Sequence, residues 1–236
     1  MTEQTPIMVQ SLFLGAAKEV PVSGTDAWWD KPWRTGYFKE PQTARCWLGY
    51  QGFRGDEQAD RAHHGGVDKA VCVYSQEHYP DWRRELAMPE LPYGAFGENI
   101  TVNGLTEERV FIGDVFSLGE AVVQVSQPRQ PCWKLARRWQ VKDLPARAEQ
   151  SGRTGFYFRV LQHGWVAPGA EMRLIEHREE RWSVAAANQV MHHAKDDVEA
   201  ARTLSECRAL SASWKDQLWQ RVCGKEASTD QRLRGG

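Results

Sequence analysis

The sequence predicts an α+β fold that is mostly β, in which short strands form a barrel or sandwich and a small group of helices follows. Between residues 8 and 176, β-branched and aromatic residues gather in short runs that glycine, proline or asparagine interrupt, which is typical of strands. After about residue 178, apolar residues recur at helical spacing instead. Many short strands favour a barrel or sandwich over a doubly wound parallel sheet.

A tight hairpin is the most specific of the strand signals. The runs at 115–118 and 121–125 are separated only by Gly119-Glu120, and two residues suffice to turn the chain between antiparallel strands. The segment 23–36, with three tryptophans around Pro32, is expected to be a loop. The remaining strands are predicted over residues 8–14, 44–50, 69–74, 99–102, 155–161 and 171–176.

Three short amphipathic helices are expected after residue 180. In the third of them, Trp214, Leu218 and Val222 recur every four residues, which places them on one face. Side chains suited to capping the three helix starts are Ser183, Asp196-Asp197 and Ser211. Shorter helices are predicted between the strands over residues 79–87, 133–139 and 144–151.

These patterns divide the chain into a barrel domain over residues 7–178, a three-helix module over 181–223 and a polar tail over 224–236. The module is too small to be an independent fold of any size. Because the tail has little apolar surface to bury, we expect it to be disordered.

Composition excludes several classes of protein. The chain has 30 basic and 31 acidic residues, so its net charge of −1 gives no general attraction to nucleic acid or to an anionic membrane. No segment approaches the ~18 consecutive apolar residues of a membrane span, and the N-terminus lacks the layout of a signal peptide. The five cysteines are scattered and form no C-x-x-C pair, which argues against disulfides and an iron–sulfur cluster. We therefore expect a cytoplasmic protein with reduced thiols.

One cysteine has an unusual setting. Cys132 follows a strand and two prolines, Pro128 and Pro131, at the predicted start of a helix. Between Arg129 and Arg153 there are seven basic and two acidic residues, a local balance of +5. Positive charge and a helix start favour the thiolate, which attacks substrates or ligates soft metals. The alternative is a buried structural cysteine beside a solvated basic helix.

A second stretch, His63-His64-Gly65-Gly66-Val-Asp68-Lys69, suits an anionic group. Glycines allow the backbone to approach a ligand closely, and Lys69 and an imidazole are near. The alternatives are a polar turn before a strand and a zinc site. Adjacent histidines do not place both rings on one tetrahedral ion as readily as spaced ones do.

Two further stretches are weaker candidates. In Gly94-Ala-Phe96-Gly97-Glu98-Asn99, the glycines should free backbone amides and Asn99 can both donate and accept. The segment Trp33-Arg34-Thr35-Gly36-Tyr-Phe-Lys39 is basic and carries a hydroxyl group. It is either an anion contact or an ordinary surface strand.

Together these stretches resemble the MOSC domain, and the likeness spans roughly residues 7–223. The resemblance rests on the order of the motifs, and Leu-Ser211-x-Ser-Trp214 is similar to the YiiM-type branch, in which a three-helix module follows a β-barrel. The motifs are Gly-Asp56-Glu-Gln-Ala-Asp with His64-Gly-Gly-x-Asp-Lys69-Ala, then Phe-Gly97-Glu-Asn99, then Gln-Pro-Arg129-x-Pro-Cys132-x-Lys134-Leu.

The resemblance implies a molybdenum cofactor, in which a pterin dithiolene and a protein cysteine hold the metal. Cys132 would be that ligand and the catalytic residue. Molybdenum accepts soft sulfur ligands, and the phosphate of the pterin needs cationic and glycine-rich contacts. The residues expected to bind the cofactor are Thr35, Lys39, His64, Lys69, Asn99, Arg129 and Lys134.

The resemblance also implies an activity. It is the reduction of N-hydroxylated compounds, especially purine bases such as 6-N-hydroxylaminopurine, a detoxification reaction. The sequence has no iron–sulfur, flavin or nicotinamide motif, so we expect a separate electron donor, most simply a flavoprotein reductase. We expect a monomer or homodimer that binds a small substrate, with no stable binding to nucleic acid or membrane.

Two other functions are compatible with the sequence. One is a cysteine-based sulfur or persulfide carrier of the molybdenum-cofactor sulfurase type, which would need no metal. The other is a nucleic-acid binding module that uses the basic helix near Arg137-Arg138, although the near-neutral total charge disfavours it. The pair His192-His193 is expected to lie on the surface.

Overall fold

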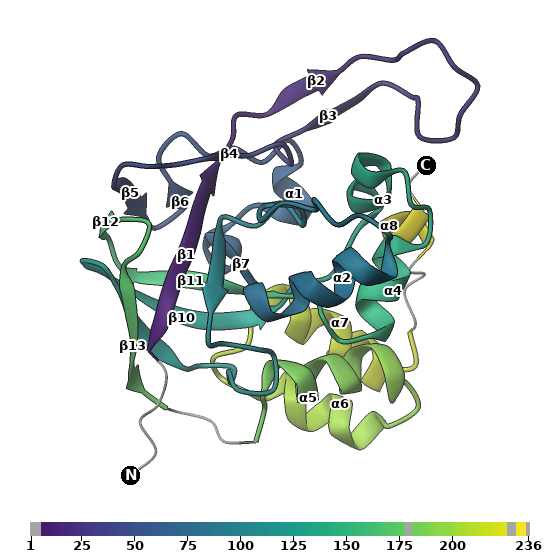
Figure 1. Ribbon diagram of the computed structural model, residues 1–236. Coiled ribbons are helices and arrows are strands. Elements are labelled where there is room, and N and C mark those ends of the chain that lie inside the picture. The colour runs from purple at the N-terminus through teal and green to yellow at the C-terminus, as the bar shows by residue number, and fades with distance from the viewer. Residues whose placement is uncertain (1–5, 178–180, 226–229, 235–236) are drawn as a thin grey trace.

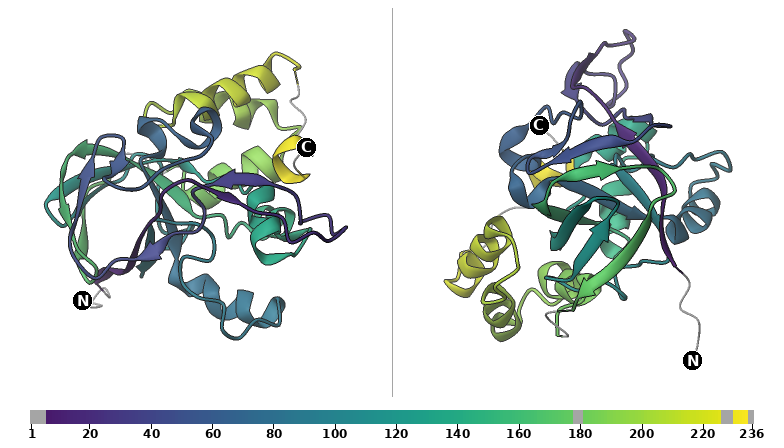
Figure 2. Two further views of the ribbon diagram at one scale, coloured as in Figure 1. Left: turned by 90° about the horizontal axis from the view of Figure 1, so that it is seen from above. Right: turned by 90° about the vertical axis from the view of Figure 1, so that its left-hand side faces the viewer.

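Seven strands close into a mixed barrel, which confirms the predicted α+β barrel fold (Figures 1 and 2). The computed structural model describes residues 6–177, 181–225 and 230–234. The order around the barrel is β13-β9-β10-β11-β7-β8-β1, and pairing of β1 with β13 closes it. Only β7 and β8 pair in parallel among these neighbours. The strands are β1 (Ile7–Leu14), β7 (Val71–Ser75), β8 (Ile100–Asn103), β9 (Val115–Leu118), β10 (Ala121–Pro128), β11 (Phe156–Gln162) and β13 (Glu171–Glu176).

The predicted hairpin forms as expected, because Ala121 pairs with Leu118 across the two-residue turn. The loop prediction for residues 23–36 needs a correction at its end. There β3 (Trp33–Thr35) pairs with β2 (Lys18–Val20) in a hairpin that extends from the barrel (Figure 1). Pairings of two or three residues are too short to show an alternating pattern. The other short strands are β4 (Glu40–Pro41), β5 (Cys46–Gly49), β6 (Gly52–Phe53) and β12 (Gly164–Val166).

Helices in the connections lie close to their predicted places. They include α2 (Tyr79–Glu85), α3 (Trp133–Trp139) and α4 (Leu144–Gln150). The sequence did not indicate α1 (Arg61–His64), a single turn that the Asp60 side chain caps. Two 3₁₀ turns, η1 (Val67–Lys69) and η2 (Gln76–His78), flank strand β7.

The C-terminal module begins as the capping residues predict. Ser183, Asp197 and Ser211 accept hydrogen bonds from the backbone amides of Ala186, Ala200 and Trp214. The first helix is shorter than expected, because it changes to a π-helical turn at residue 189. The elements are α5 (Val184–Asn188), η3 (Gln189–His193), α6 (Val198–Ser205) and α7 (Ala212–Val222).

The module packs directly on the barrel and shares its core. Trp214 and Leu218 are fully buried in one apolar cluster with barrel residues such as Val125. The amide of Ser211 also donates to the carbonyl of Ser126 over 2.9 Å. Helix α7 is thereby anchored to strand β10, which leads to Cys132. None of the helices among the described residues is long and apolar enough to cross a membrane.

The expectation of a disordered tail is wrong for one part of it. Residues Asp230–Arg234 form a short helix, α8, against α3. Arg232 donates to the carbonyl of Pro131 and to Glu149, both over 2.6 Å. These partners lie far away in sequence, so the polar composition of the tail does not reveal them. The predictions for 226–229 and 235–236 lie outside the described residues.

Candidate functional site

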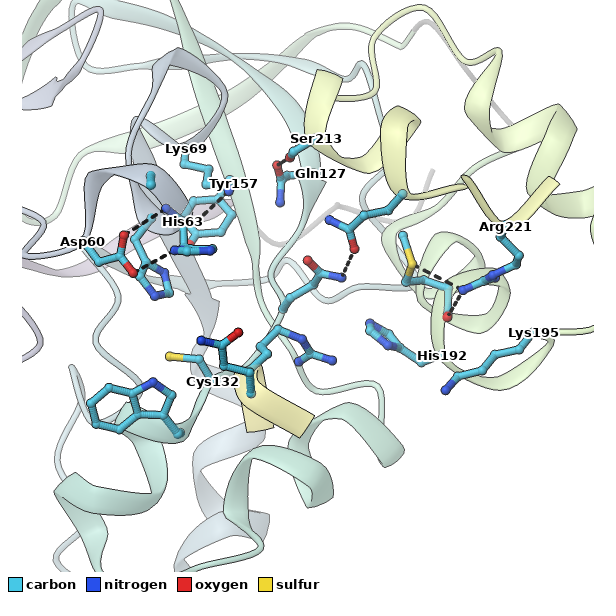
Figure 3. A pocket seen from close by; sticks show the side chains of 18 of the residues that line it. Asp60, His63, Lys69, Gln127, Cys132, Tyr157, His192, Lys195, Ser213 and Arg221 are labelled. Carbon is cyan, nitrogen blue, oxygen red and sulfur yellow. Dashed lines mark hydrogen bonds and ion pairs between the residues drawn. The ribbon is translucent and has the colours of Figure 1, made fainter. Parts of the chain in front are cut away.

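Two adjoining cavities, of about 410 and 80 Å³, are lined by the residues that were expected to ligate the metal or bind the cofactor. The larger lies between the barrel, the module and the tail (Figure 3). All eight predicted site residues line the smaller cavity, and three of these eight, His64, Lys69 and Cys132, line both cavities. Gln130 and Tyr157 also line both, so five residues form the boundary between the two. The structure therefore brings the separate motifs together.

Cys132 is at the junction of strand β10 and helix α3. It is the N-cap residue of α3 with an extended backbone, as the prolines predicted, and only 7% of it is exposed. Two other cysteines are placed in strands, as expected from sequence. Cys46 begins β5, and Cys72 is buried in β7, where burial raises the pKa of its thiol to about 11. Cys132 is the cysteine that lines both cavities.

A buried guanidinium lies beside Cys132. Arg129 is only 5% exposed, and its Nη2 donates to the carbonyl of Phe96 over 2.7 Å. Its Nη1 is buried and has no hydrogen-bond partner among the described residues. Lys134, on the first turn of α3, is buried too. A buried charge without a full set of partners is costly, so this pair of cations favours an anionic ligand.

The His64 stretch turns back towards the same place. Gly66 has φ +98°, a conformation that favours glycine, and the Lys69 ammonium donates to the carbonyl of His63 over 2.7 Å. Burial and the nearby charge of Lys134 lower the pKa of His64 to about 3. At neutral pH the His64 ring is therefore uncharged. The positive charge expected near it must come from Lys69, Lys134 and Arg129 instead.

The loop over residues 94–99 is built for packing. Gly97 has φ +75°, and a Cβ atom there would lie 2.8 Å from the ring of Tyr37. The carboxylate of Glu98 accepts hydrogen bonds from the amides of Gly94 and Phe96 over 2.8 and 3.1 Å. These two amides are thus occupied within the loop, and the expectation that its glycines free them for a ligand is wrong.

Three predicted cofactor-binding residues already have partners in the protein. The Thr35 hydroxyl accepts a hydrogen bond from the amide of Tyr37 over 3.0 Å, and the Lys39 ammonium pairs with Asp56. The Asn99 amide donates to Asp56 over 2.9 Å, while its oxygen accepts from the amide of Cys72 over 3.1 Å. These contacts hold the wall of the smaller cavity in place. Binding of a cofactor by Thr35, Lys39 and Asn99 remains a prediction.

The module and the tail supply a wall of the larger cavity that the sequence did not indicate. His192 was expected on the surface, yet its side chain is 3% exposed and lines this cavity. Gln130, two residues before Cys132, donates to Gln217 of α7 over 3.1 Å. No local pattern reports such contacts, because the partners are far apart in sequence. Cationic residues on this wall are Lys195, Arg221, Lys225 and Arg232.

Comparison with known proteins identifies the family. The model of the MOSC domain matches residues 60–173, and that of the YiiM-like 3-alpha helix domain matches residues 182–222. Protein YiiM of Escherichia coli is 39% identical over 78% of this chain and 83% of its own length. The chain belongs to the MOSC-domain family, in its YiiM-type branch.

Other relatives of this YiiM-type chain match most of it, although one of them is a much longer protein. An uncharacterized protein of Bacillus subtilis, YflK, is 50% identical over 90% of this chain and 93% of its own. A reductase of Gibberella moniliformis is 35% identical over 73% of this chain, which corresponds to 31% of that longer protein. The crystal structure of YiiM from Geobacillus stearothermophilus has a TM-score of 0.77 at 37% identity, covering 92% of this chain and all of that one.

The lowered pKa of His64 predicts how acid affects stability. Folding lowers the pKa of His64 from 6.5 to about 3. Between these two pH values the ring is protonated in the unfolded chain but not in the native state, so the free energy of unfolding decreases as the pH falls below about 6.5. In His64→Gln, the loss of unfolding free energy between about pH 7.5 and pH 5 should be smaller by about 2 kcal/mol. Urea unfolding at both pH values measures it.

The matched control is His63→Gln, because the side chain of His63 is 79% exposed. This variant should keep the pH dependence of the unaltered protein. If His64→Gln also keeps that dependence, then the His64 ring is not a neutral group that folding desolvates.

Proposed function

We propose that this protein is a molybdenum-cofactor-dependent reductase of N-hydroxylated compounds, with N-hydroxylated purines such as 6-N-hydroxylaminopurine as the preferred class. One observation carries the proposal. A buried cysteine lies beside a buried guanidinium, one nitrogen of which has no partner in the described part of the chain, where two cavities meet. This combination offers a soft metal ligand and an anion contact at one place. Membership of the MOSC family and the related reductase point to the same chemistry.

The residues present fit the cofactor. Cys132 would ligate the metal, and Arg129, Lys134 and Lys69 would hold the phosphate of the pterin. The Nη1 of Arg129 supports this assignment, because an anion would supply the partner that none of the described residues gives it. When bound, the cofactor supplies the two-electron chemistry that breaks the N–O bond. The chain itself would bind and orient both ligands.

The larger cavity suits a small planar substrate. Trp133 and Tyr157 line it and offer aromatic surface against which a purine can stack. The amides of Gln127, Gln130 and Gln217 can donate to and accept from the polar edge of a base. Because Cys132 and Tyr157 also line the smaller cavity, a base in the larger one lies next to the proposed metal position.

A sulfur or persulfide carrier remains the second candidate, because a cysteine among cations also suits that role. The burial of Cys132 supports the reductase more than the carrier, since a carrier cysteine must reach a second protein. Metal analysis separates the two. Protein made in cells that synthesise the cofactor should hold about one molybdenum per chain if it is the reductase, and none if it is the carrier.

Replacement of Cys132 should abolish the activity without unfolding the protein. Cys132→Ser removes the proposed soft ligand but keeps a polar side chain of similar size, so N–O reduction should fall to background. Cys223→Ser is the control, because Cys223 is exposed and lines neither cavity. Activity with 6-N-hydroxylaminopurine and far-UV circular dichroism are measured for both. Full activity in Cys132→Ser with metal still bound would remove Cys132 as the ligand.

A separate electron donor is also proposed, most simply a flavoprotein reductase. The purified, loaded protein should reduce 6-N-hydroxylaminopurine with reduced viologen and should not do so with NADPH alone. Activity with NADPH should return when a flavoprotein reductase fraction is added, because the sequence lacks a motif for binding flavin or nicotinamide. Product formation is followed by chromatography. Efficient turnover with NADPH and no second protein would contradict the requirement for a donor.

A further inference from the structure

His192 is held in one orientation at the wall of the larger cavity. It lies on the π-helical turn η3, and its Nδ1 is 3.1 Å from a carboxylate oxygen of Glu149 on α4. The other oxygen of Glu149 accepts from Arg232 of α8 over 2.6 Å. Three side chains from distant segments, those of His192, Glu149 and Arg232, are thus linked through the Glu149 carboxylate (the Glu149 triad). The Glu149 triad fixes the orientation of the His192 ring. In many functional histidines a carboxylate bound to one ring nitrogen orients the other nitrogen in the same way.

The charges of the triad determine which ring nitrogen carries the proton. Burial acts to raise the pKa of Glu149, but His192 and Arg232 overcome this effect and lower it to about 2. Glu149 is therefore an acceptor at neutral pH. Burial lowers the pKa of His192, so the ring is neutral and its one proton lies on Nδ1, facing Glu149. Nε2 is left with a lone pair.

This Nε2 atom has no partner in the described part of the chain. It is buried, and no group among the described residues makes a hydrogen bond to it. Trp214 packs edge-on against the ring with centroids 6.3 Å apart. Its indole Nε1 is also buried without a partner among the described residues, and no hydrogen bond joins the two side chains. The side chain that follows in sequence, His193, is exposed. A buried acceptor without a donor is costly, and this acceptor belongs to a residue that lines the cavity (Figure 3).

We propose that Nε2 of His192 accepts a hydrogen bond from an N–H or O–H group of the substrate, so that the C-terminal module selects substrates carrying a donor. A hydroxylamino or amino group on a purine meets this requirement, whereas a methyl group in the same place does not. Cys132 lines the same cavity, so the module would complete a site that the barrel begins. This inference rests on the proposed function for its substrate class.

The alternative is that the Glu149 triad only fastens the module and the tail to α4. The two roles differ in which ligands should lose affinity when His192 is replaced. A fastening role predicts that all ligands lose affinity equally, or none does, when His192 is replaced. An acceptor role predicts a loss confined to ligands that have the donor, because only they lose a hydrogen bond.

The test uses the full chain without bound metal, and the probes are 6-N-hydroxylaminopurine and 6-methylpurine. Calorimetry gives Kd for each probe with His192→Phe, which keeps a planar ring but has no acceptor. His193→Gln is the matched control, because His193 is exposed and does not line the cavity. We expect His192→Phe to weaken the binding of 6-N-hydroxylaminopurine about tenfold and to leave 6-methylpurine within about twofold.

Nitrogen NMR of the histidine rings gives a second readout that does not depend on the variant folding. The unaltered protein should show His192 with its proton on Nδ1, and the Nε2 signal should shift when 6-N-hydroxylaminopurine is added. A proton on Nε2, no shift, or equal loss of both probes in His192→Phe would each overturn the inference. Failure of the unaltered protein to bind either purine would overturn it together with the proposed substrate class. Binding without reduction by the loaded protein would overturn only the proposed function.

Discussion

The burial of a positive charge beside a thiol is the constraint on which the site depends. Strand β10 ends inside the protein, and the next residue is Arg129. One of its guanidinium nitrogens has no partner among residues 6–177, 181–225 and 230–234. Lys134 adds a second buried cation, and Cys132 lies between the two in sequence. Such an arrangement is costly in the absence of an anion. The proposed cofactor, which carries a phosphate and a metal that accepts sulfur ligands, would satisfy the cations and the thiol together.

Three parts of the chain meet at this point, and each contributes something different. The barrel provides the cysteine and the cations, while the module provides the opposite wall with His192 and Gln217. The tail fastens the junction, because Arg232 binds both the carbonyl before Cys132 and Glu149. The barrel and the module share one apolar core, which fixes their positions relative to each other. The larger cavity is therefore a product of the whole chain.

Much of this arrangement could be predicted from the sequence, and the rest could not, for one physical reason. Prolines, glycines and local charge identified Cys132, Arg129 and the His64 turn, because those signals act over a few residues. The inward position of His192 depends on Glu149, 43 residues earlier by numbering, and on Arg232 in a tail whose composition predicts disorder. Partners this distant leave no local pattern.

The most direct test of the account is an X-ray absorption spectrum at the molybdenum edge of protein purified from cells that make the cofactor. The extended fine structure counts the sulfur atoms bound to the metal. The account predicts that Cys132→Ser loses one sulfur neighbour relative to the unaltered protein, while the sulfur atoms of the dithiolene remain. An identical sulfur count in the two proteins would contradict it, as would the absence of bound molybdenum from the unaltered protein.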